Sequence, residues 1–275
     1  MNFLNRHLSR FISKLTLSPR RVLAAGLVAA ALLVGVGIGP WSPLALDRVD
    51  RALTQGQPEA ALRVCQRIAR FSPFPGRRDE ARYRAALILA SRDGRAGEAL
   101  VLLRGLLRDG PRGETLQGET LALTARVLES AGQLERAARR YEERAALGPE
   151  SGPWLLSAAS AWERAGRERK ALLILGHVAA TGGPEKARAE LAMGRIFLGT
   201  GDPAGAYAHY SAVLALGPGP DELRLARLGQ ALALDALGQA EQAVAALDEA
   251  DPDHDPAIGI TRERVARRAE ESEPR

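Results

Sequence analysis

Three aspartates near the C-terminal end form the residue cluster that most resembles a site for chemistry. Asp251, Asp253 and Asp255 occupy alternate positions, as carboxylates do at the start of a calcium-binding loop. Such a loop then requires a glycine, and a glutamate six residues further on. The sequence has Pro256 and Arg262 at those two positions. We therefore interpret the segment as a polar turn, with a weak cation site as the alternative.

The remaining residues capable of chemistry are scattered along the chain. The sequence has four histidines, and no two of them have the spacing of a metal site. The glycine-rich stretch Gly35–Gly39 lies inside an apolar run and is not placed as a phosphate-binding loop would be. We predict a protein that is not an enzyme and carries no cofactor or metal. An enzyme or a metal protein is the least favoured alternative.

Two histidines and the single cysteine have structural interpretations. His177 and His209 lie in helical stretches, and we expect packing or surface positions for both. Cys65 lies in an apolar-periodic stretch, where cysteine usually acts as a small core residue. An intermolecular bridge or a reactive thiol is the alternative for Cys65.

The positive charge of the chain is concentrated at its start. The net charge is +5, and residues 1–46 contain five basic residues and no acidic one. Removing these five from the 38 basic residues leaves 33, which equals the number of acidic residues. A neutral body argues against a nucleic-acid partner, and a basic N-terminus suggests membrane topology.

An uncharged stretch follows this basic leader. Residues 22–41 read VLAAGLVAAALLVGVGIGPW, and about 20 such residues in a helix span a bilayer core. Basic residues precede the stretch and balanced charges follow it, so the positive-inside rule places the N-terminus in the cytoplasm. We predict an uncleaved transmembrane helix over residues 22–41. The alternatives are a cleaved signal peptide, of twin-arginine type in one variant, and a mitochondrial presequence.

The sequence suggests two further features of this region. Residues 1–21 form a basic cytoplasmic leader that would make a short amphipathic helix on anionic lipid, or would only set the topology. Ala31, Gly35 and Gly39 form a ladder of small residues in the predicted span. Such ladders allow two helices to approach closely, so they are our candidates for self-association and a homo-oligomer.

The rest of the chain has an internal repeat marked by glycine, alanine and proline. Turn glycines recur at intervals of 38, 38, 34, 35 and 37 residues, and each is followed five residues later by an alanine. A proline follows most of these alanines after twelve residues. Glycine permits a tight turn, alanine permits close helix packing and proline ends a helix. The glycines are Gly56, Gly94, Gly132, Gly166, Gly201 and Gly238, and the alanines are Ala61, Ala99, Ala137, Ala171, Ala206 and Ala243.

This pattern resembles the tetratricopeptide (TPR) family, whose repeating unit is a helix, a turn and a second helix. The resemblance covers residues 43–256, and the stretch from Gly194 to Pro218 matches best. It implies an all-α, right-handed solenoid of about six repeats, which would follow the transmembrane helix. Residues 257–275 would form a polar capping helix and tail, with Thr261 as the helix N-cap.

The resemblance also implies a site, because the first helix of each TPR repeat lines a concave face that binds peptides or partner helices. Its projection onto this chain has arginines at the centre and leucines toward the C-terminal end. The candidate binding residues are Arg84, Ile88, Arg92, Arg126, Glu129, Ser160, Glu163, Arg164, Leu191, Arg195, Leu198, Leu228 and Leu232. The arginines would suit acidic partners, and a simple solvated face is the alternative.

We therefore expect a non-catalytic scaffold that docks other proteins in envelope assembly or secretion. The chain has three lysines and two asparagines, a skew that suggests a bacterial coding sequence rich in G and C. The predicted location is the bacterial inner membrane, with one span anchored in lipid and the repeats in the periplasm. The alternatives are a chaperone-like protein at the translocation channel and a secreted adaptor released by signal cleavage.

Overall fold

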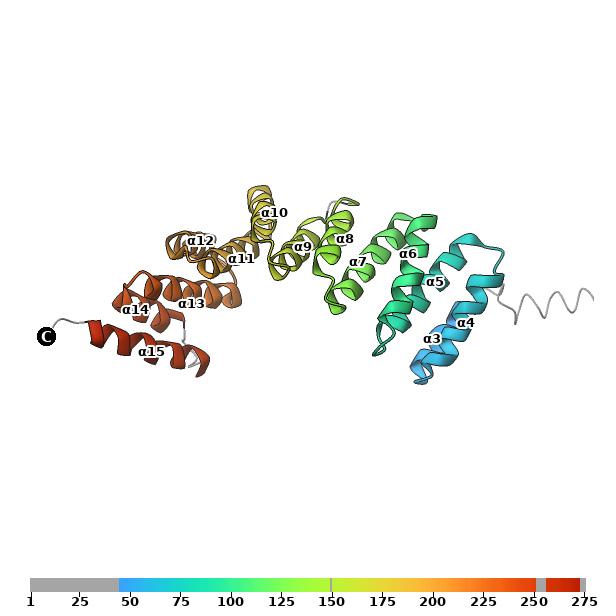
Figure 1. Ribbon diagram of the computed structural model, residues 1–275, viewed down its shortest axis with the longest axis horizontal. Coiled ribbons are helices and arrows are strands. Elements are labelled where there is room, and N and C mark those ends of the chain that lie inside the picture. The colour runs from blue at the N-terminus through green and yellow to red at the C-terminus, as the bar shows by residue number, and fades with distance from the viewer. Residues whose placement is uncertain (1–44, 149, 251–255, 273–275) are drawn as a thin grey trace, which may run out of the picture. The chain divides into compact units, whose positions relative to one another are not determined.

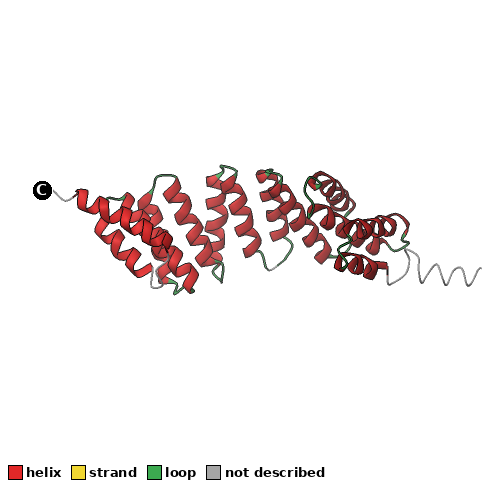
Figure 2. Cartoon of the chain, turned by 90° about the horizontal axis from the view of Figure 1, so that it is seen from below, coloured by secondary structure: helices red, strands yellow, loops and turns green. Residues whose placement is uncertain are grey.

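The computed structural model describes residues 45–148, 150–250 and 256–272, and these residues form only helices and loops (Figures 1 and 2). The leader, the predicted span with Ala31, Gly35 and Gly39, and the segment Asp251–Asp255 lie outside the described residues. The helices are α3 (Ala45–Thr54), α4 (Pro58–Phe71), α5 (Pro75–Ala90), α6 (Ala96–Asp109), α7 (Glu114–Ser130), α8 (Leu134–Ala145), α9 (Gly152–Arg164), α10 (Glu168–Thr181), α11 (Lys186–Gly199), α12 (Pro203–Ala215), α13 (Pro220–Ala236), α14 (Ala240–Ala250) and α15 (Pro256–Ser272).

The helices are arranged as consecutive pairs, one pair for each predicted repeat. The pairs run from α3 and α4 to α13 and α14, and α15 follows as a single helix. The chain divides into two compact units, Met1–Leu116 and Gln117–Arg275, with the boundary in the first turn of α7. Within the described part of the chain, no helix is both long and apolar enough to cross a bilayer.

Five of the six turns between paired helices have the same backbone geometry. In the fourth repeat, Gly166 has a φ of 69°, which is the left-handed region that glycine enters at little cost. Its N–H donates to the Glu163 carbonyl at 2.8 Å, and the next N–H donates to the Trp162 carbonyl at 2.9 Å. This pair of bonds is the Schellman motif, which satisfies the last carbonyls of a helix. The turns at Gly56, Gly132, Gly201 and Gly238 have the same two bonds.

The alanines of the repeat lie where paired helices meet. All six, from Ala61 to Ala243, have a relative exposure of 0%. Bulkier residues of the partner helix pack beside them, among them Trp162, which is also buried. The predicted roles of glycine and alanine are therefore confirmed by the geometry of the helix pairs.

The second repeat differs, and the prediction for Ile88 is wrong. Its turn covers Ser91–Arg95, five residues, where the other turns have three. The longer turn moves α5 by two positions relative to Gly94, so Ile88 takes the inward position that Trp162 has in the fourth repeat. Ile88 is only 5% exposed, and Leu87 is turned toward solvent instead. Burial removes the apolar Ile88 side chain from water, so it is not on an exposed binding face.

The fifth and sixth repeats pack around the ring of Tyr210 on α12. A Cβ on Gly229 of α13 would lie 2.3 Å from this ring, and one on Gly194 of α11 would lie 2.9 Å from it. Both glycines therefore make room for Tyr210, which lies in a buried cluster with Ala206 and Ala233.

The capping helix is longer than predicted. Helix α15 begins at Pro256, so Thr261 lies inside the helix and is not its N-cap. Proline suits the first position of a helix because its missing N–H would have no intrahelical partner there. Ile258 and Val265 of α15 are buried in the cluster formed by α13 and α14. The helix is polar on one side only and covers the last repeat with the other.

Candidate partner-binding groove

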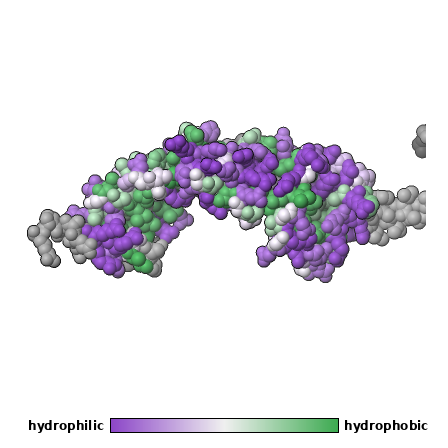
Figure 3. All heavy atoms as spheres, viewed as in Figure 1, coloured by the Kyte–Doolittle hydropathy of each residue, from purple (hydrophilic) through white to green (hydrophobic). Residues whose placement is uncertain are grey.

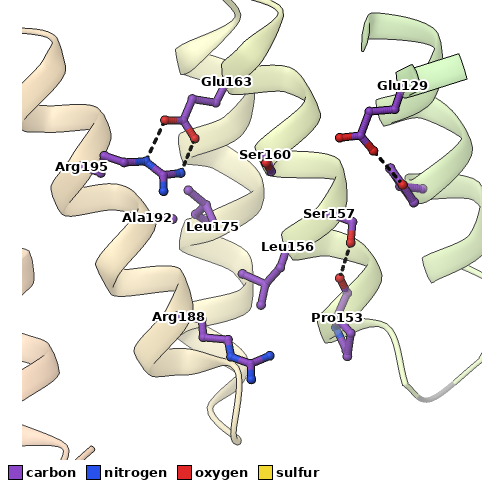
Figure 4. A pocket seen from close by; sticks show the side chains of 11 residues that line it. Glu129, Pro153, Leu156, Ser157, Ser160, Glu163, Leu175, Arg188, Ala192 and Arg195 are labelled. Carbon is purple, nitrogen blue, oxygen red and sulfur yellow. Dashed lines mark hydrogen bonds and ion pairs between the residues drawn. The ribbon is translucent and has the colours of Figure 1, made fainter. Parts of the chain in front are cut away.

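A cavity of about 530 Å³ opens between first helices of the third, fourth and fifth repeats. Its walls come mainly from α9 and α11, with one residue each from α7, α8 and α10 (Figure 4). The lining residues are Glu129, Tyr141, Pro153, Leu156, Ser157, Ser160, Glu163, Leu175, Arg188, Ala192 and Arg195. The predicted site residues Glu129, Ser160, Glu163 and Arg195 are brought together here. All of them belong to the second unit.

Glu129 is held at one side of this groove by two neighbours. Its carboxylate accepts a hydrogen bond from the Tyr141 hydroxyl at 3.0 Å (Figure 4). The same carboxylate forms an ion pair with Arg164. Burial, followed by the bond to Glu129, raises the pKa of Tyr141 to about 12. Tyr141 therefore stays neutral and donates to Glu129 at any physiological pH.

Glu163 and Arg195 form the opposite side. The Arg195 guanidinium donates to both Glu163 oxygens, at 3.0 and 2.6 Å (Figure 4), and this bidentate geometry gives a directional contact. The hydrogen bond and the charge of Glu163 raise the pKa of Arg195. Both side chains are thus already paired within the protein.

Two arginines remain open to a partner. Arg126 is exposed on α7 and makes no ion pair with any residue in the described part of the chain. It occupies the same place before its turn glycine as Ser160 and Arg195 do, six residues upstream. Arg188 lines the groove with a side chain that is 63% exposed, and it forms only a long ion pair of 3.9 Å with Glu222. Leu156, Ala192 and two serines line the groove together with Arg188, so the groove combines positive charge with a small apolar surface.

The other predicted arginines pair with acids of the preceding repeat. Arg84 bonds Asp50 of the first repeat at 2.7 Å, in addition to Glu80 of its own helix at 2.6 Å. Arg92 bonds Glu59 at 2.7 Å. The same relation, an acid followed by an arginine 32 to 36 residues later, joins neighbouring repeats in both units. Its further members are Arg164–Glu129, Arg167–Glu135, Arg195–Glu163 and Arg268–Asp235.

The predicted leucines are partly buried and pack against the core. Leu191 and Leu198 pack against the Tyr210 cluster, and Leu228 packs against the cluster of α13 to α15. Leu232 is half-buried on α13. Figure 3 shows hydrophobic side chains gathered over α13, where Leu223 and Leu225 are the exposed ones. The exposed apolar surface at this end of the chain therefore comes from Leu223 and Leu225, which were not among the predicted leucines.

Solved structures with a similar fold include tetratricopeptide repeat proteins. No family model and no curated protein matches the sequence. A tetratricopeptide repeat protein from Parabacteroides merdae superposes with a TM-score of 0.56 at 15% identity, covering 82% of this chain and 90% of that one. BtubC (BKLC) from P. vanneervenii gives 0.54 at 16% identity, over 82% and 94% of the two chains. A putative kinesin light chain from Podosopora anserina with nearly identical TPR-like repeats gives 0.50 at 19% identity, over 70% and 99%.

The chain has the TPR fold. The prediction of an all-α solenoid of helix–turn–helix repeats is thereby confirmed for the described residues.

The TPR groove contains residues that the sequence analysis missed. Tyr141 comes from a second helix, so a projection of first helices alone does not include it. Arg188 lies on α11 thirteen residues before Gly201, earlier than the positions projected. The acids that pair with the arginines did leave a signal, because their separation from the arginines equals the repeat length. A search for opposite charges at that interval would have found them.

The two histidines that the structure describes and the cysteine lie at packing or surface positions. His209 lies 2.7 Å from Glu190 and stacks on Phe197, and His177 is exposed on α10. Cys65 is fully buried, as predicted, and burial raises its pKa to about 11. Among the described residues, no group of three histidine, cysteine or acidic side chains is placed to hold a metal ion.

Proposed function

We propose that this chain is a docking protein that holds an acidic segment of a partner, as a peptide or a helix, in the groove of α7, α9 and α11. The groove itself carries the proposal, because it is open, lined by neighbouring repeats and placed on the helices that form the inner face of a TPR array. Its residues offer binding groups but no nucleophile with an adjacent base, so binding without catalysis is the function that they support.

The charges of the groove favour an acidic partner. Glu129 and Glu163 are neutralised by Arg164 and Arg195 inside the protein. Arg126 and Arg188 can bind carboxylates of the partner, because a guanidinium donates one or two hydrogen bonds to a carboxylate. An apolar side chain between those carboxylates would fit against Leu156 and Ala192.

The proposed location is the periplasmic side of a bacterial inner membrane. The support is the sequence of residues 22–41, which is uncharged, long enough for one span and preceded by five basic residues. In this arrangement the leader stays in the cytoplasm, and the repeats act as a scaffold for an envelope or secretion assembly. Self-association through Ala31, Gly35 and Gly39 would double the number of grooves in one complex.

The test is crosslinking in cells, followed by purification from membranes through a C-terminal tag. We expect a defined partner that is recovered by the wild-type chain and lost by the variant Arg126→Glu/Arg188→Glu. The matched control is Arg139→Glu/Arg169→Glu, which makes the same charge change at exposed positions of second helices. Retention of the partner by the groove variant, with normal folding, would contradict the proposal.

A chaperone-like role is the second candidate, and the exposed leucines of α13 favour it. In that case the crosslinks would join many unfolded envelope proteins, and Leu223→Ser/Leu225→Ser would remove them while the arginine variant would not. A secreted adaptor is distinguished by the mass of the intact protein, since signal cleavage would remove the apolar stretch.

A further inference from the structure

Two exposed phenylalanines lie in the loop between α4 and α5. Phe71 is 55% exposed and Phe74 is 52% exposed, although phenylalanine is usually buried in a soluble domain. The loop has a defined shape, because the N–H of Phe74 donates to the Oγ of Ser72 at 3.3 Å and the Ser72 N–H donates to the Ile68 carbonyl at 2.9 Å. The backbone thus presents the rings to the outside.

One arginine lies against each ring. The Arg70 guanidinium lies 5.1 Å from the centre of the Phe71 ring, and that of Arg77 lies 5.0 Å from the centre of the Phe74 ring. Residues 60–78 contain five arginines and no acid. The next acid along the chain, Asp79, is buried and neutralised by Arg112 at 2.8 Å. The loop therefore has two exposed aromatic rings with an arginine against each of them.

The helix pair α3–α4 places this loop at the end where the chain enters the first repeat. A three-residue turn joins α3 to α4, so the two helices run antiparallel, and they lie side by side (Figure 1). Helix α3 has 10 residues and α4 has 14, so they measure about 15 and 21 Å at 1.5 Å per residue. Phe71, the last residue of α4, therefore extends about 6 Å past the start of α3.

The sequence leaves little distance between this end and the apolar stretch. Trp41 closes the stretch, and α3 starts at Ala45. Four residue steps reach at most about 14 Å even when fully extended. A chain that is anchored through residues 22–41 would therefore hold the Phe71–Arg78 loop close to the bilayer surface.

We propose that Phe71 and Phe74 insert into the surface of an anionic bilayer while Arg70, Arg77 and Arg78 contact lipid phosphates. The proposal rests on the membrane anchor of the proposed function and gives the first repeat a second contact with the same membrane. The apolar side chains of protein segments that lie on a membrane surface reach about 5–10 Å into the headgroup region. Arginine contacts phosphate with two parallel hydrogen bonds, and its aliphatic stem stays among apolar groups.

A pair of labelled single-site variants tests the contact in the full chain. Phe74→Cys carries an environment-sensitive fluorophore at the loop, and Gln55→Cys carries it at the opposite end of the same helix pair, where Gln55 is exposed. Cys65 is buried with a pKa of about 11, so it does not compete for the label at neutral pH. The chain is reconstituted into vesicles of phosphatidylcholine and phosphatidylglycerol.

We expect the label at position 74 to shift its emission to shorter wavelength and to lose quenching by iodide, while the label at position 55 stays in water. Arg70→Glu/Arg77→Glu in the Phe74→Cys background should reverse both effects, and Arg139→Glu/Arg169→Glu should not. Circular dichroism checks that each variant keeps its helices.

Three outcomes would overturn the proposal. A water-accessible label at position 74, in a chain that resists alkaline extraction from the vesicles, would overturn this contact alone. Removal of the whole chain by alkaline extraction would overturn the anchor and the contact together. Protection of position 74 in detergent without lipid would show a protein contact in place of the bilayer.

Discussion

Tyr210 and Ala206 show how single residues set the fit between repeats. The Tyr210 ring fills the space left by Gly194 and Gly229, and Ala206 lies in the same cluster with no exposed surface. A small residue at position 206 is therefore needed for the close approach of α11 and α12. The sequence predicted this for Ala206 from its spacing, whereas the role of Gly229 needed the structure, because Gly229 lies outside the repeated pattern.

Ala206→Leu should overpack this cluster. We expect the free energy of unfolding to fall by about 1–3 kcal/mol, because extra methylenes force neighbouring side chains and backbone apart. Ala208→Leu, at an exposed position on the same helix, is the control and should leave stability nearly unchanged. Urea unfolding followed by circular dichroism measures both, and equal stabilities would argue against the packing described here.

Tyr141 should make stability depend on pH in the alkaline range. Its pKa is about 12 in the folded protein, above the ordinary value of 10.0, so the unfolded chain loses this proton at lower pH. The stabilisation is complete below pH 10 and is lost as the pH rises toward 12. Tyr141→Phe should flatten this part of the profile, and Tyr207→Phe should not. Denaturant midpoints measured across that range provide the test.

At the scale of elements, a glycine in a turn and a glycine within a helix should respond differently to substitution by alanine. Gly166→Ala places a Cβ at a φ of 69° and should cost about 1–2 kcal/mol. Gly176→Ala changes an exposed glycine within α10 that has open space around it and should stabilise by about 0.5–1 kcal/mol. Opposite signs in thermal unfolding are expected, and a loss of stability in both variants would contradict the assignment of the two backbone states.

Helix pairing could be predicted from the sequence, and the detail of the second repeat could not. Gly94 is followed by its alanine after five residues, as the other turn glycines are, so the glycine and alanine pattern contains no sign that Ser91–Arg95 forms a longer turn. The consequence was the wrong prediction for Ile88, because a shift of two residues turns an outward position inward on a helix. Of the predicted arginines, Arg195 lines the groove, and the acids that pair with the predicted arginines inside the protein were not part of the prediction.

At the scale of the whole molecule, the helices of each unit contact mainly the helices next to them in the chain, as in other solenoids. Val265→Asp would place a charge in the cluster that α15 forms with α13 and α14, and an unpaired buried charge is costly. We expect faster hydrogen exchange in α13–α15 and no change in residues 45–116. Ile260→Asp, on the exposed side of α15, is the control. Faster exchange throughout the chain would show that the repeats unfold together and would contradict this expectation.

The ion pairs between repeats have a direction along the chain. In most of them the acid lies in the earlier repeat and the arginine in the later one, as in Asp50–Arg84 and Asp235–Arg268, whereas Arg188–Glu222 has the opposite direction. Each pair of this exposed kind adds little stability, but the direction means that one repeat can follow another without leaving unmatched charges. Tandem duplication of a repeat within the gene would therefore preserve pairings of this common direction, so an array of this kind can change its length during evolution while most of its charges still match.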